Sequence, residues 1–136
     1  MSHEFISEYL NKPWINGGQG PDGYDCWGLV RTVLRDHYNI DVALIECNAG
    51  DIRQVMQRFD GHDERANWLE TKQPADGDLV LIRRGKRPSH IGIWLDIDGG
   101  VIMHVPFKGS VWLHQPHQLQ GALQVDSYWH HRSLMA

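Results

Sequence analysis

The stretch GYDCWGLV at residues 23–30 decides the fold, because a glycine- and proline-rich approach ends there and a periodic apolar pattern begins. Asp25 is of a residue type that often caps helix N-termini. Beyond it, apolar residues recur at spacings of three and four, namely Trp27, Leu29, Val30, Val33 and Leu34. The pattern predicts a helix from Cys26 to His37 with one apolar side, and it puts Cys26 in the first turn.

A cysteine at a helix N-terminus is a candidate nucleophile. Only the thiolate attacks well, and an ordinary cysteine is mostly thiol at neutral pH. The unpaired backbone N–H groups and the dipole of a helix favour an anion at that end, and the same N–H groups can hold an oxyanion. The alternative is that Cys26 is a small apolar residue packed in the first turn. With Cys47 as the second cysteine of the chain, a disulfide framework is not expected and a reduced thiol is allowed.

Length and composition fit one globular domain over residues 1–136. Hydrophobic residues make up 41% of the chain and charged residues 22%, which are ordinary values for a soluble domain. The net charge of −4 argues against general nucleic-acid binding, and the one basic cluster, at residues 83–87, is short. The chain shows neither a membrane span nor the pattern of a signal peptide. We therefore expect a protein made in the cytoplasm.

Helical patterns come first in the chain and strand patterns follow. Residues 3–11 and 49–59 carry apolar residues at helical spacing, and residues 68–70 are expected to form a short edge strand. Short apolar runs bounded by turn residues then predict antiparallel strands at residues 77–82, 90–95, 101–105, 110–114 and 124–129. Helices before strands predict an α+β fold, in which N-terminal helices pack on a central antiparallel sheet.

A thiol nucleophile needs a general base, and the base needs a partner that orients it. His90 is the candidate base, because it opens a strand directly after an expected turn at Pro88-Ser89. A side chain at that position can stand at the rim of the sheet. A surface or hydrogen-bonded structural histidine is the alternative.

The hairpin that follows His90 selects the third member of the site. If its loop is the three-residue segment 97–99, Gly92 lies opposite His104, and His104 becomes a diagonal neighbour of His90 on the same face. A two-residue turn at Asp98-Gly99 would put His104 on the other face, out of reach. The register of this hairpin therefore tests the triad.

Metal binding is the competing use of histidine. His114 and His117 have a compatible spacing, but Pro116 makes the segment a loop without a nearby acidic or cysteine ligand. His130 and His131 on one strand would point to opposite faces. We expect no metal ion.

The glycine-rich loop before Cys26, residues 14–23, permits tight turns and a close approach of the backbone. It is either a connector or one wall of a substrate groove. We expect substrate contacts from this loop and from the neighbours of Cys26 and His90, namely Trp14, Gly17, Gly18, Tyr24, Asp25, Trp27 and Ser89.

An ordered set of motifs is present, consisting of Trp14, Gly17-Gly18, Asp25-Cys26-Trp27-Gly28-Leu29, Gly77-Asp78-Leu79-Val80, His90-Ile91-Gly92-Ile93 and His104. Together they resemble the NlpC-type (NlpC/p-sixty) family of papain-like cysteine peptidases, over about residues 14–112. The resemblance implies a papain-like NlpC-type fold and a Cys-His-His triad. In that triad Cys26 attacks the carbonyl carbon, His90 takes and returns the proton, and His104 orients the ring of His90.

The resemblance also implies a substrate. Members of the family cleave peptidoglycan stem peptides, typically between D-γ-glutamyl and diaminopimelate residues, and need no metal or organic cofactor. Trp27 stands where a serine is usual, as expected of the phage tail-assembly branch. This implies a phage or prophage tail-tip hydrolase that acts in a virion tail with tail-tip proteins as partners. The alternatives are a catalytically idle tail module, a free-standing bacterial wall hydrolase or effector toxin, and a transferase or deamidase with the same acyl-enzyme chemistry.

Overall fold

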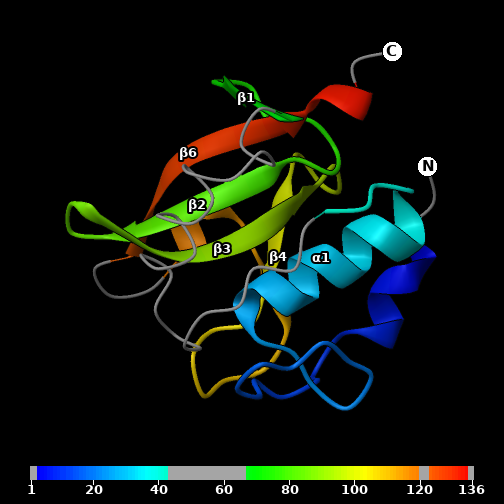
Figure 1. Ribbon diagram of the computed structural model, residues 1–136. Coiled ribbons are helices and arrows are strands. Elements are labelled where there is room, and N and C mark those ends of the chain that lie inside the picture. The colour runs from blue at the N-terminus through cyan, green and yellow to red at the C-terminus, as the bar shows by residue number, and fades with distance from the viewer. Residues whose placement is uncertain (1–2, 43–66, 120–122, 135–136) are drawn as a thin grey trace.

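The computed structural model describes residues 3–42, 67–119 and 123–134, with the side chains of residues 87–89 and 134 left aside. Within these residues, one α-helix packs on a six-stranded sheet of order β1-β6-β2-β3-β4-β5 (Figure 1). Every strand pair is antiparallel. The predicted α+β class is confirmed, whereas the helix expected at residues 49–59 lies outside the described residues.

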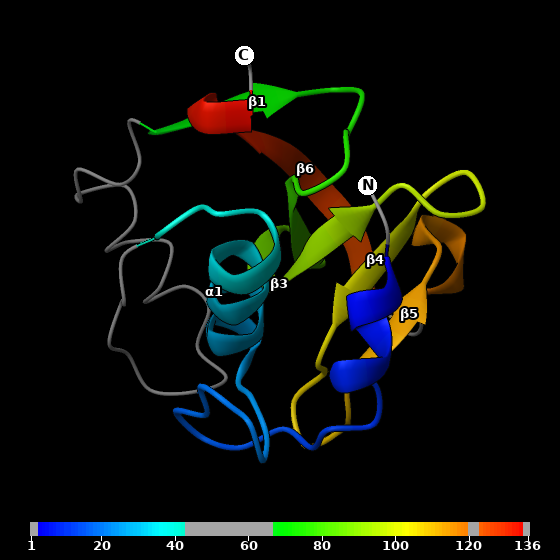
Figure 2. The same cartoon turned by 90° about the vertical axis from the view of Figure 1, so that its right-hand side faces the viewer.

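The helix α1 spans Cys26–His37, as predicted. Its N-cap is Asp25, whose carboxylate accepts a hydrogen bond from the backbone N–H of Gly28 at 2.6 Å. The apolar side of α1 is fully buried against β3 and β4, and Figures 1 and 2 both show the helix beside β3. The shared core contains Leu29, Val30, Val33, Leu34, Ile91, Ile93, Leu95 and Met103. The cap and the apolar spacing together explain where the helix begins and how it is oriented.

The strands are β1 (Trp68–Thr71), β2 (Leu79–Arg84), β3 (Arg87–Leu95), β4 (Val101–His104), β5 (Trp112–His114) and β6 (Leu123–His131). Strands β2 to β5 form the expected meander, in which each strand pairs with the next. Strand β1 lies at the edge of the sheet, also as predicted. Strand β6 returns to the far side of β2 and lies between β2 and β1. Short 3-10 helices follow β5 and β6, η3 at Pro116–Gln118 and η4 at Arg132–Leu134.

The helix predicted for residues 3–11 is shorter than expected. It is the 3-10 helix η1, Glu4–Glu8. Beyond it the backbone turns, with Asn11 at φ +70°, and becomes extended. The N–H of Asn11 donates to the carbonyl of Val111 at 3.0 Å, and the N–H of Val111 donates to the carbonyl of Lys12 at 2.9 Å. Pairing with the segment before β5 thus replaces the last predicted helical turn.

The turn predicted at Pro88-Ser89 is also wrong. The chain reverses at Gly85-Lys86, where Gly85 adopts φ +61°, and β3 already begins at Arg87. A left-handed φ suits glycine better than any other residue, and this explains why the reversal comes earlier. His90 therefore lies inside β3 rather than at its first position.

Gly28 is in the first turn of α1, where alanine would ordinarily strengthen a helix by about 1 kcal/mol. A Cβ atom at Gly28 would lie 2.0 Å from the carbonyl oxygen of Gly18. We therefore expect Gly28→Ala to lower the free energy of unfolding in urea by about 1–3 kcal/mol. Gly109→Ala is the control, because its Cβ would come no closer than 3.3 Å to another atom. Unchanged stability of Gly28→Ala would mean that the loop does not press on the helix.

Candidate active site

Cys26 is the first residue of α1 and packs, half-buried, against the core that the helix shares with the sheet. The loop before it is held close to the helix end, since the N–H of Asp25 donates to the carbonyl of Gly18 at 3.1 Å. A Cβ on Gly18 would lie 2.8 Å from the carbonyl oxygen of Gly23, so the loop closes only with glycine there. Burial raises the pKa of Asp25, and hydrogen bonds from the backbone N–H groups of Gly28 and Gly17 act against that rise.

The same loop is tied to the segment that follows β4. The N–H of Trp14 donates to the carbonyl of Gly109 at 2.9 Å, and the N–H of Tyr24 donates to the carbonyl of Pro13 at 3.0 Å. The ring of Trp14 stands edge-on to that of Phe107, with centroids 4.6 Å apart. Since β4 ends at His104, the approach to Cys26 and the segment after His104 lie side by side.

The register of the β3–β4 hairpin brings the two predicted histidines together. Leu95 pairs with Val101, and the same register puts Gly92 opposite His104, as the triad requires. Residues 96–100 connect the two strands. Nε2 of His90 lies 2.8 Å from Nδ1 of His104. The predicted hairpin geometry and the diagonal contact between the two rings are confirmed.

Both rings of this pair are buried, with 8% of His90 and 2% of His104 exposed. Burial lowers the pKa of His90 from its ordinary 6.5 to about 4. Burial, together with the neighbouring His90 and His114, lowers the pKa of His104 to about 3. Both imidazoles are therefore neutral at pH 7, and each has one N–H donor and one acceptor nitrogen.

A third histidine, His114, extends the pair to a row of three rings, which we call the histidine line. Nε2 of His104 lies 2.8 Å from Nδ1 of His114, which is half-buried on β5. Because Ile102 pairs with His114, the ring of His114 is diagonal to that of His104. In the sequence, His114 stands out only through its metal-compatible spacing from His117. The connection between β4 and β5, residues 105–111, contains the turn residues Pro106 and Gly109, but a connection of this length does not fix the register of β5.

A β-bulge lies next to His90. Ile82 pairs with His90 but Arg83 pairs with Pro88, so Ser89 is an extra residue in β3. Bulges turn the neighbouring side chains and are common beside active sites. The backbone of Ser89 thus adjoins the candidate base, while its side chain lies outside the described residues.

The histidines and α1 belong to different faces of the sheet. Along β3, His90 alternates with Ile91, which is in the core under α1, and shares its face with Trp94. Trp94 belongs to a second apolar cluster with Val80, Ile82 and Ile102. Cys26, at the end of α1, and His90, near the beginning of β3, are therefore positioned by two different layers of packing.

The predicted substrate contacts fall into two groups. Tyr24 and Trp27 belong to the core, with 4% and 2% exposed, and this burial favours a role in packing. Gly17 is exposed at φ +70° and Trp14 is half-exposed beside Phe107, of which 57% is exposed. Contact with substrate by any of these residues stays a prediction.

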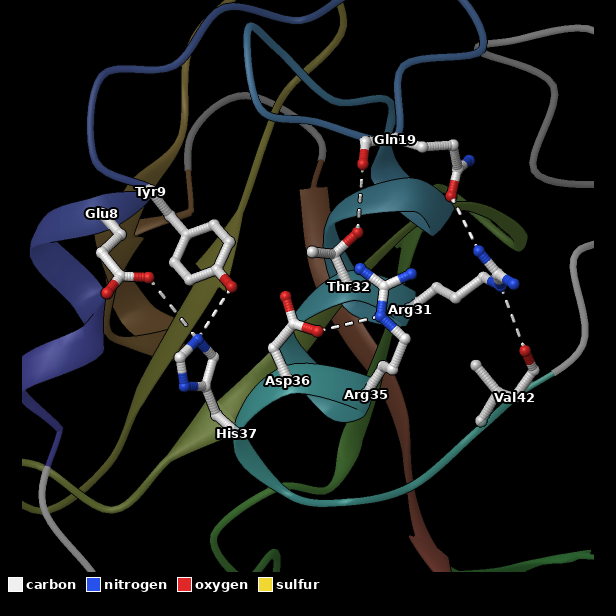
Figure 3. Close-up of polar contacts among 9 residues, drawn as sticks. All are labelled: Glu8, Tyr9, Gln19, Arg31, Thr32, Arg35, Asp36, His37 and Val42. Atoms are coloured by element: carbon white, nitrogen blue, oxygen red, sulfur yellow. Dashed lines mark hydrogen bonds and ion pairs between the residues drawn. The ribbon is translucent and has the colours of Figure 1, made fainter.

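Polar contacts join the outer side of α1 to η1 and to the glycine-rich loop (Figure 3). Arg31 and Thr32 each donate to Gln19, at 3.4 Å, and the hydroxyl of Tyr9 lies 2.9 Å from Nε2 of His37. A pocket of about 380 Å³ opens on this side, and none of the three predicted catalytic residues lines it. The pocket is separate from the histidine line, and these contacts serve to hold the loop on the helix.

His130 and His131, the adjacent histidines weighed as metal ligands, have other partners. His130 pairs with the buried carboxylate of Asp78, and Nδ1 of His131 lies 2.8 Å from the hydroxyl of Ser133. In the described part of the chain, no group of three or more His, Cys, Asp or Glu side chains is placed to hold a metal ion. Nor is any helix among these residues long and apolar enough to cross a membrane.

A helix with a cysteine in its first turn, packed on an antiparallel sheet that carries a buried histidine pair, defines a papain-like α+β protein. The NlpC/P60 family model matches residues 11–136, and the chain belongs to the NlpC/P60 family. It is similar to a Haemophilus influenzae protein named "Probable endopeptidase", with 26% identity over 113 residues. The matched region is 82% of this chain and 61% of that relative, so the chain spans less than two thirds of the relative's length.

The burial of the two neutral histidines predicts acid sensitivity. Unfolded histidine titrates near 6.5, whereas the folded values are about 4 for His90 and about 3 for His104. Between these values the unfolded chain binds more protons, so the free energy of unfolding should fall as the pH drops from about 7 to about 4. For His90 alone the loss is of the order of 3 kcal/mol.

Urea unfolding between pH 7 and pH 4 measures this slope. His104→Asn should show a smaller slope than wild type, because one buried group has been removed. His117→Gln, at an exposed histidine, should leave the slope unchanged. Equal slopes in wild type and His104→Asn would show that His104 is not buried in solution.

Proposed function

We propose that this protein is a cysteine endopeptidase that hydrolyses peptidoglycan stem peptides. Cys26 is the nucleophile, His90 the general base and acid, and His104 the residue that orients His90. The hydrogen bond of 2.8 Å between His90 and His104 carries the proposal, because it supplies a base with the orienting partner that nucleophilic catalysis needs. Family membership and the name of the Haemophilus relative support the same activity.

The atoms of the histidine pair define the route of the proton. The contact with His104 uses Nε2 of His90, so Nδ1 receives the proton of the Cys26 thiol. The thiolate attacks the carbonyl carbon of the scissile peptide, and the backbone N–H of Cys26 holds the oxyanion. His90 then returns the proton to the leaving amine, and water hydrolyses the acyl-enzyme.

We locate the contact between Cys26 and His90 at the beginning of β3. Helix α1 covers the face that carries Ile91, and His90 is on the other face. To react with each other, the two side chains must meet around the end of the strand, beside the bulge at Ser89. The backbone hydrogen bond from Trp14 to Gly109 keeps the loop before Cys26 beside the segment after His104 at this end.

The aromatic pair of Trp14 and Phe107 forms one wall of the proposed groove. It stands on the loop before Cys26 and on the segment after His104, and Phe107 is largely exposed. Apolar rings at such a place bind the carbon skeleton of a peptide. The bond between D-γ-glutamyl and diaminopimelate residues is the proposed cleavage site, on the strength of the family resemblance.

Replacing the nucleophile tests the proposal directly. We expect wild type to release new fragments from purified peptidoglycan, as seen by mass spectrometry, and Cys26→Ala to release none. The fragments identify the scissile bond, and products with a new acceptor group would indicate a transferase. Cys47→Ala, at a cysteine outside the described residues, should keep full activity. Equal fragment patterns from wild type and Cys26→Ala would rule out covalent catalysis at Cys26.

The dependence of activity on pH tests the role of His90. A base works only when deprotonated, and burial lowers the pKa of His90 to about 4. We therefore expect kcat/KM to persist as the pH falls from 7 to about 5 and to drop as His90 becomes protonated near pH 4. Initial rates on a purified stem peptide measure this. An acidic limb near the ordinary 6.5 would indicate that a different, exposed histidine is the base.

We further propose that the enzyme works in a phage or prophage tail, with tail-tip proteins as partners. Trp27 supports this, since the tail-assembly branch carries tryptophan after the nucleophile. Mass spectrometry of purified virions should then detect the chain. Its absence from virions, together with stem-peptide cleavage, would favour a free-standing wall hydrolase or effector toxin. Its presence without any cleavage would favour an idle structural module.

A further inference from the structure

His104 has a second ring partner that the proposed triad does not use. Its Nδ1 lies 2.8 Å from Nε2 of His90, and its Nε2 lies 2.8 Å from Nδ1 of His114. We propose that His114 is a positioning residue, which holds His104 as its Nε2–H tautomer and thereby keeps His90 able to accept the thiol proton. This inference rests on the proposed function for its catalytic meaning.

The hydrogen bonds that connect the three rings can run in either of two directions, from His90 to His114 or from His114 to His90. Because a neutral imidazole has one N–H and one acceptor nitrogen, His104 must donate through one nitrogen and accept through the other. In the first direction, His90 donates from Nε2 to His104, and His104 donates from Nε2 to His114. In the second, His114 donates from Nδ1 to His104, and His104 donates from Nδ1 to His90.

Only the first direction suits catalysis. With its proton on Nε2, His90 has an acceptor at Nδ1, the nitrogen that receives the proton of Cys26. In the second direction Nε2 of His90 is the acceptor and its proton sits on Nδ1, where it blocks the base. After proton transfer His90 carries both protons, and His104 can accept from its Nε2–H only in the first direction.

His114 supplies the partner that the first direction needs. His104 is 2% exposed and cannot turn to water for a partner, so the acceptor for its Nε2–H must come from the protein. Pairing of β4 with β5 places the acceptor there, since Ile102 is opposite His114. Without it, the first direction leaves a buried N–H unpaired, which is costly, and the inactive tautomer gains population. Burial keeps His90 and His104 neutral, and this makes tautomers the relevant states.

The tautomers can be measured without any substrate. Nitrogen-15 NMR of the histidine side chains in the wild-type protein near pH 7 should show His90 and His104 protonated at Nε2. His114→Phe should shift His104 toward the Nδ1–H form. His114→Asn, whose amide oxygen can accept in place of Nδ1, should restore the wild-type form, and His117→Phe, at an exposed histidine, should match wild type. A wild-type His104 protonated at Nδ1 would overturn the proposal. This measurement uses the wild-type protein alone, so it does not depend on whether a variant folds.

The reactivity of Cys26 and the turnover of substrate provide a second test. The rate at which iodoacetamide alkylates Cys26, followed by peptide mapping, and kcat on a stem peptide should both fall about 10- to 100-fold in His114→Phe, the factor expected from one unpaired buried N–H. KM should stay within about twofold, because His114 orients a base and does not bind substrate. His114→Asn should recover most of both rates. Unchanged alkylation and kcat in a folded His114→Phe protein would refute the role.

The two proposals fail in different ways. If wild type cleaves no stem peptide, the proposed function is wrong, while the tautomer of His104 and the alkylation of Cys26 still test His114. If wild type cleaves stem peptides and His114→Phe does so equally well, the proposed function stands and the role of His114 is refuted.

Discussion

The register of the β3–β4 hairpin is the constraint on which the candidate site depends. Gly99 and Gly100 adopt φ values of +87° and +113°, which few other residues tolerate, and they close a loop that pairs Trp94 with Ile102. A shift of one residue would turn His104 to the opposite face, because side chains alternate along a strand. The hydrogen bond between His90 and His104 therefore depends on this register.

A second constraint acts on the loop that precedes the candidate nucleophile, Cys26. The glycine-rich loop packs so closely on the first turn of α1 that a Cβ on Gly28 would meet the carbonyl of Gly18 at 2.0 Å. The same loop bonds to Gly109, beyond the end of β4. Backbone contacts thus connect the loop before Cys26 both to the first turn of α1 and to the segment that follows His104.

The line of three histidines is a polar feature in an apolar layer. Val80, Ile82, Trp94 and Ile102 surround it on the face of the sheet away from α1. Burial disfavours the charged ring, so His90 and His104 stay neutral and bond to each other rather than to water. In a row of neutral imidazoles the tautomer of one ring restricts that of the next, so the contacts of His104 connect β5 to the candidate base on β3.

The limits of α1 and its cap at Asp25 could be predicted from the sequence, because capping and apolar periodicity act within a few residues. For the β3–β4 hairpin, turn chemistry left a three-residue and a two-residue turn open, and the structure shows the register that places His90 diagonal to His104. The tertiary structure decided that β6 lies between β1 and β2, and that His114 joins the histidine line. It also ended the first helix at Glu8 through pairing with Val111, and moved the turn before β3 to Gly85. The strand order and the place of His114 depend on contacts between segments far apart or joined by irregular loops, which local patterns do not specify.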